Sequence, residues 1–136
     1  MQRAGLYWRL ASLVFALPFV LLGGCAHSRH TDDEINVYPA NYKADILAAM
    51  HAYLNDPTGI RDPAIAEPAL KSIGGITRYV VCLRFNAKQS ATVYAGTRET
   101  AAVFVVGRFD RFAEGVHEQC TGSTYVPFPE LGKLTR

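Results

Sequence analysis

The segment that most constrains the fold is residues 77–87, "TRYVVCLRFNA", in which two kinds of side chain alternate. Successive side chains of a strand point to opposite faces of a sheet, so the alternation predicts a strand with two different faces. One face carries Tyr79, Val81, Leu83 and Phe85. The other face carries Arg78, Val80, Cys82, Arg84 and Asn86. We expect the first face to pack against a helix.

Three other segments have the composition of strands but a weaker pattern. Residues 60–66 are predicted as a short edge strand, because Pro63 lacks the N–H group that a central strand needs. Residues 97–105 and 108–113 are predicted as two further strands, joined by the tight turn Val106-Gly107. No connection here is long enough for a helical crossover, so we expect antiparallel pairing.

Residues 42–54 carry the helical period. Ile46, Met50 and Tyr53 recur at helical spacing, Asn41 is a suitable cap, and Asp56-Pro57 ends the pattern. The sequence therefore predicts an α+β fold, in which one N-terminal amphipathic helix packs on a small antiparallel sheet of three to four strands.

Two cysteines of the predicted domain, Cys82 and Cys120, form an even pair and are predicted to form a disulfide. A bridge that closes a loop of about 39 residues stabilises a fold by about 4 kcal/mol in the chain-entropy model. Residues 114–136 have few periodic cues. The disulfide is expected to pin this C-terminal tail over the sheet face opposite the helix.

The first 24 residues have the layout of a secretory signal. Arg3 and Arg9 precede residues 10–22, an apolar segment of about 13 residues that is shorter than the roughly 20 needed to span a bilayer. The sequence Leu22-Gly23-Gly24-Cys25 then resembles a bacterial lipobox. The resemblance implies that Cys25 becomes the lipid-modified first residue, carrying acyl chains such as palmitate. The alternative is ordinary cleavage after Ala26, which would discard this cysteine.

Residues 25–37 are polar and predict a tether, followed by one domain at residues 38–136. His27 and His30 precede three acidic residues, which suggests a metal site, but flexible ligands without supporting groups favour a solvated linker instead. In Gram-negative lipoproteins an aspartate after the cysteine usually signals retention at the inner membrane. Ala26 occupies that position, so we expect an outer-membrane location facing the periplasm.

Removal of residues 1–24 takes away Arg3 and Arg9 and leaves 12 basic residues against 12 acidic ones. No dense cluster of lysine and arginine remains in this nearly neutral chain. Nucleic acid is therefore not an expected partner.

The chain resembles a group of small, mostly uncharacterised proteobacterial lipoproteins in three features. These are the stretch "VVCLRFNAK", a helix followed by "DP", and the hairpin arm "GRFDRF". The resemblance covers about residues 38–131 and implies a compact α+β lipoprotein without a known activity. Val106 departs from the residues that suit a two-residue hairpin, where asparagine fits better. This turn is therefore expected to be strained or of another type.

Arg84, Asn86 and Lys88 continue one face of the central strand and form a candidate binding set for a carboxylate or phosphate. The simpler interpretation is the polar side of a half-buried strand that runs into a loop, and the alternation favours it.

No nucleophile-elbow, phosphate-loop, dinucleotide-binding or zinc-protease motif is present, so no cofactor or metal is predicted. The leading hypothesis is a non-catalytic, lipid-anchored envelope lipoprotein that binds another protein or an anionic envelope component. The alternative is a small envelope hydrolase or thiol enzyme that uses His117 or Cys120, which requires a free thiol.

Overall fold

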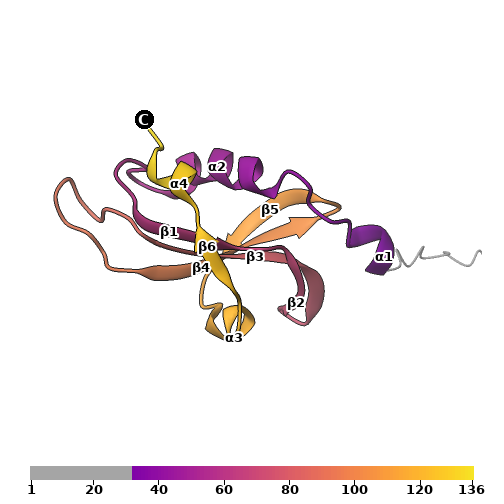
Figure 1. Cartoon of the computed structure of the whole chain (residues 1–136). Helices are drawn as coiled ribbons and strands as arrows, with labels where there is room; N and C mark the ends of the chain where they lie inside the picture. The colour runs from indigo at the N-terminus through magenta and orange to yellow at the C-terminus, as the bar shows by residue number, and fades with distance from the viewer. Residues whose placement is uncertain (1–31) are drawn as a thin grey trace, which may run out of the picture.

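A computed structural model describes residues 32–136, and Cys25, His27 and His30 lie outside the described residues. Six strands form a single antiparallel sheet, and four helices flank it (Figure 1). The helices are α1 (Asp32–Ile35), α2 (Tyr42–Tyr53), α3 (His117–Cys120) and α4 (Pro129–Gly132). The strands are β1 (Arg61–Ala66), β2 (Ala69–Ile73), β3 (Ile76–Asn86), β4 (Arg98–Val105), β5 (Arg108–Ala113) and β6 (Tyr125–Pro127).

The predicted fold class is wrong, because the molecule is mostly a six-stranded sheet with small helices. The strand order is β5-β4-β3-β1-β6, and β2 pairs with the first half of β3. Helix α2 begins at the predicted residue, whereas the three other helices are single turns of four residues each. The prediction of three to four strands missed β2 and β6, which lie in segments with too little alternation to be recognised.

Strand β1 is not the predicted edge strand, because it pairs with β3 on one side and β6 on the other. The register with β3 shifts between Arg61 and Ala64, and Asp62 in this bulge has φ 49°. Pro63 therefore sits where the ladder is interrupted, and its missing N–H removes no regular hydrogen bond. Its carbonyl oxygen accepts a 2.8 Å hydrogen bond from the Phe128 amide.

The two predicted faces of β3 are confirmed. Val81, Leu83 and Phe85 are buried in the larger core beneath α2, where they pack with Ile46 and Met50. The opposite face buries a second, smaller core. Its buried members are Ala66, Val80, Cys82, Ala101, Val116 and Cys120. The sheet is thus covered on both faces, by α2 and α4 on one side and by α3 on the other (Figure 1).

The predicted disulfide is confirmed, but it does not hold the whole tail on one face. Cys82 in β3 is bonded to Cys120 in α3, in the smaller core. Strand β6 then joins the sheet edge beside β1, and the chain continues to Phe128 and Leu131 in the larger core. The tail therefore wraps around the sheet edge, because its apolar residues are buried against both faces.

The hairpin β4–β5 turns at Val106 and Gly107, as predicted, with φ values of 51° and 70°. Two consecutive positive φ values are those of a type I′ turn, which suits glycine and asparagine. A β-branched side chain in the left-handed region costs about 1–2 kcal/mol. The strain anticipated at Val106 is therefore present.

The folded part begins within the segment predicted as a tether. Residues Asp32–Ile35 form one helical turn, and the Ile35 carbonyl oxygen accepts a 2.8 Å hydrogen bond from the Val106 amide. From residue 32 onward, no helix is both long and apolar enough to cross a membrane.

Candidate functional site

Each member of the candidate binding set is engaged by a different neighbour. Arg84 Nε donates a 2.9 Å hydrogen bond to Glu99 Oε2 on the adjacent strand. Asn86 Oδ1 accepts a 3.0 Å hydrogen bond from the Gly96 amide. Lys88 Nζ lies 3.8 Å from Asp56 Oδ2. The arrangement supports the simpler interpretation, that these side chains fasten the strand to its surroundings.

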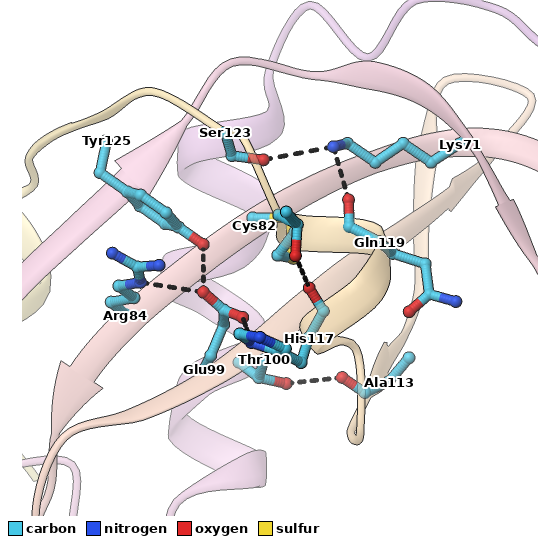
Figure 2. Close-up of a disulfide and its surroundings, with 12 residues drawn as sticks. Lys71, Cys82, Arg84, Glu99, Thr100, Ala113, His117, Gln119, Ser123 and Tyr125 are labelled. Carbon is cyan, nitrogen blue, oxygen red and sulfur yellow. Dashed lines mark hydrogen bonds and ion pairs between the residues drawn. A yellow bond between two sulfur atoms is a disulfide. The ribbon is translucent and has the colours of Figure 1, made fainter.

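Glu99 is the centre of a polar cluster beside the disulfide (Figure 2). It also accepts a 2.7 Å hydrogen bond from the Tyr125 hydroxyl, and the Arg84 guanidinium stacks 4.0 Å from the Tyr125 ring. The Glu99 side chain is only 17% exposed. Burial opposes its ionisation, but the hydrogen bonds from Tyr125 and Arg84 outweigh burial and lower the pKa of Glu99. Both hydrogen bonds end on Oε2, so this carboxylate oxygen already has two donors within the cluster.

The two residues of the enzyme hypothesis lie near this cluster. Cys120 is 1% exposed and bonded to Cys82, so it holds no free thiol in this state. His117 is largely exposed, with Nδ1 at 3.7 Å from Glu99 Oε1. A thiol enzyme could use Cys120 only after reduction of the disulfide. No group of three or more histidine, cysteine or acidic side chains is placed to bind a metal within residues 32–136.

A second polar cluster joins the end of α2 to the loop that follows β3. Asp56 Oδ1 accepts hydrogen bonds from the amide and the hydroxyl of Thr58, at 3.0 and 2.6 Å. Lys88 and Arg136 approach the other carboxylate oxygen. The hydrogen bonds from Thr58, assisted by these two cations, lower the pKa of Asp56 to about 2. Lys88 Nζ also donates a 3.3 Å hydrogen bond to the Thr58 hydroxyl, so both of its side-chain partners, Thr58 and Asp56, belong to this cluster. Lys88 thus fastens the loop after β3 to the end of α2.

A different feature is open to solvent: a groove of about 580 Å³ between α2 and the edge strand β5. Its helix side is lined by Ala48, Ala49 and Ala52, whose small side chains leave the space. Its strand side is lined by Phe109 and Phe112. We call this feature the α2–β5 groove.

Aromatic packing makes the floor of the groove rigid. The rings of Phe109 and Phe112 lie 4.9 Å apart, and the Tyr53 ring lies 4.4 Å from Phe112. Both phenylalanines point toward the helix because the β4–β5 register shifts by one residue between Val103 and Phe104. This bulge brings side chains three residues apart to the same face.

Charged side chains line the rim of the groove. Arg111 is paired with Asp110, whereas the Arg108 side chain makes no hydrogen bond or ion pair within the described part of the chain. Asp45 contributes one negative charge from α2. The groove thus offers an apolar floor and a partly basic rim, a combination suited to an apolar side chain flanked by acidic groups.

The sequence pattern did not reveal this groove. "RFDRFA" has the phenylalanines at i and i+3, which in a regular strand would place them on opposite faces. The spacing itself was a usable signal, since a one-residue bulge is the usual way to bring such a pair together. The alanines of α2 resemble ordinary helix-forming residues until the neighbouring strand is placed.

Comparisons of this chain with protein-family models, with curated proteins and with solved structures find no match.

Proposed function

We propose that this protein is a lipid-anchored lipoprotein of the cell envelope, attached through Cys25, whose domain is a non-catalytic binding module for another envelope protein. The lipobox-like sequence Leu22-Gly23-Gly24-Cys25 supports the anchor. The Cys82–Cys120 disulfide supports it too, since such bonds persist in oxidising compartments outside the cytoplasm. Outer-membrane placement, facing the periplasm, remains part of the proposal because Ala26 follows Cys25.

The α2–β5 groove is the single observation that carries the binding role. The polar clusters around Glu99 and Asp56 are internally paired, whereas the groove presents half-buried aromatic rings and the unpaired Arg108 side chain. Well-packed pockets for one anchoring side chain usually dominate the energy of a protein interface. The proposed partner therefore inserts an apolar side chain next to a carboxylate.

The anchor is tested by the intact mass of the N-terminal peptide from protein isolated from its native membrane. We expect an acylated Cys25, and we expect the Cys25→Ala variant to lose both the modification and its sedimentation with membranes. An unmodified N-terminus after Ala26 would contradict the anchor.

The binding role is tested by placing a photocrosslinking amino acid at Ala48, within the groove, in cells that make the lipidated chain. We expect a discrete adduct with one protein, and no such adduct when the crosslinker is placed at the exposed Ser90. The groove-filling Ala52→Trp variant should abolish the adduct, whereas His51→Trp, on an exposed position of the same helix, should not. An adduct that survives Ala52→Trp would overturn the groove as the binding surface.

A further inference from the structure

Exposed apolar side chains gather at one end of the domain. Seven large hydrophobic residues of the described chain are strongly exposed, and five of them belong to the entry segment or to the β2–β3 and β4–β5 hairpins. These five are Val37, Tyr38, Leu70, Ile76 and Val106, with exposed fractions of 46–53%. We call this set the apolar end. The remaining two, Val93 and Val126, lie elsewhere in the fold.

Direct contacts connect the entering chain to the hairpins. A Cβ atom added at Gly107 would lie 3.2 Å from Val37 Cγ1, so Val37 packs beside the β4–β5 turn. The Tyr38 ring lies edge-on to the Tyr79 ring, with centroids 5.5 Å apart. Leu70 is the cross-strand partner of Tyr79. Val37, Tyr38 and Leu70 are therefore tied to Tyr79 and to the β4–β5 turn, whereas Ile76 belongs to this end through its place at the tip of the β2–β3 hairpin.

The sheet topology places both hairpin turns at this end. Tyr79 pairs with Phe104 in the antiparallel β3–β4 ladder. The direction from Tyr79 back to Ile76, at the start of β3, is therefore the same as the direction from Phe104 to the turn at Val106. The tips of β2–β3 and β4–β5 therefore lie at the same end of the sheet, and α1 lies there as well (Figure 1). Ile76 and Val106 project from these two tips.

We propose that the apolar end lies against the lipid surface, so that the domain is oriented on the membrane. This inference rests on the proposed lipid anchor at Cys25. The seven peptide steps from Cys25 to Asp32 span at most about 25 Å, and Asp32 opens the helix that lies at this same end. The chain length thus keeps the apolar end close to the acyl chains.

The composition of the apolar end fits an interface with lipid. Tyrosine is enriched at membrane–water boundaries, where its ring is half buried and its hydroxyl remains hydrated. Branched aliphatic residues at hairpin tips can enter the headgroup region while the backbone of each turn stays in water.

The proposed contact with lipid also explains why valine occupies position 106 in the strained turn. An exposed valine with positive φ is unfavourable for the fold, and such a residue at a tip suggests a function outside the fold. Contact with lipid gives this exposed apolar side chain a role that asparagine would not fill.

The test uses the lipidated, disulfide-bonded full chain in vesicles of phosphatidylethanolamine with a minor share of phosphatidylglycerol. A single environment-sensitive fluorophore is attached to Val106→Cys or to Leu70→Cys. The matched control is Val93→Cys, because Val93 and Val106 are both 53% exposed. We expect a blue shift, and quenching by nitroxide-labelled lipids, at positions 106 and 70 but not at position 93.

Each failure has a separate signature. If Cys25 carries no acyl chain and the protein stays in the aqueous phase, the anchor and the contact that rests on it are both overturned. If the protein is acylated and vesicle-bound but positions 106 and 70 match position 93, only the contact is overturned. A blue shift that rises with protein concentration in the absence of vesicles would also overturn it, and would indicate pairing between copies of the chain.

Discussion

The backbone amide of Val106 donates a 2.8 Å hydrogen bond to the carbonyl oxygen of Ile35. This bond fastens the segment that enters the domain to the tip of the β4–β5 hairpin. The donor residue has φ 51°, so the same residue that secures the entry segment is also held in an unfavourable conformation. The hydrogen bond uses only the backbone, which allows the side chain to be changed without removing it.

Val106→Asn is therefore expected to stabilise the isolated domain. Asparagine tolerates the left-handed region, and relief of the valine strain should raise the free energy of unfolding by about 1 kcal/mol. For a domain of this size that corresponds to an increase in Tm of about 4–8 °C. Thermal unfolding followed by circular dichroism measures it, with Val93→Asn as an equally exposed control that should change little. A lower Tm for Val106→Asn would show that the valine stabilises the fold.

Removal of the disulfide is expected to destabilise the protein strongly. The bond closes a loop with a sequence separation of 38 residues, and the chain-entropy model assigns about 4 kcal/mol to such a loop. The double variant Cys82→Ala/Cys120→Ala should unfold at a much lower urea concentration than the wild type. A reducing agent should lower the wild-type midpoint and leave the variant unchanged. Equal midpoints for reduced and oxidised wild type would contradict this expectation.

Asp56 is expected to contribute a pH-dependent part of the stability. Its pKa falls from an ordinary value of 3.8 to about 2 in the folded protein, chiefly through the hydrogen bonds from Thr58. A lowered folded pKa means that the stabilisation is present above pH 3.8 and is lost as the pH falls through about 2. The stability difference between wild type and Asp56→Asn should therefore shrink across this window, as measured by urea unfolding at each pH. Asp62→Asn, at an exposed position, serves as the control, and a difference that stays constant with pH would rule out this role.

Phe128 is expected to be essential to the fold although only eight residues follow it in the sequence. It is 1% exposed and packs in the larger core after the tail has crossed the sheet edge. Truncation of a fully buried phenylalanine to alanine typically costs about 3–5 kcal/mol. Phe128→Ala should lower the unfolding midpoint far more than Val126→Ala, which changes an exposed residue of β6. Comparable losses for the two variants would show that the tail is not part of the core.

Local patterns predicted those elements whose burial is uniform along one face. The alternation of β3 was recognisable because Val81, Leu83 and Phe85 face one core. Helix α2 was recognisable because Ile46 and Met50 repeat on its buried side. The disulfide followed from the even number of cysteines left after Cys25 was assigned to lipid. In each case the signal lies within one segment or in a simple count.

The groove and the wrapped tail could not be predicted in the same way. Phe109 and Phe112 meet only because of a bulge against β4, and a bulge depends on the partner strand. Strand β6 has only three residues. It forms because it pairs with the edge of β1 at Ala64, Ile65 and Ala66. The apolar end needs the entry segment and two hairpins to be placed together. None of these features has a period that one segment could reveal.

The sequence by itself determined the central strand, the long helix and the cysteine pair, and it supports the proposed export and anchoring signal. Only the tertiary structure decided that β1 is interior, that Arg84, Asn86 and Lys88 are separately engaged, and that the α2–β5 groove is open. The physical reason is that periodicity records how one segment is buried. Pairing, bulges and surface grooves depend on contacts between segments that are distant along the chain.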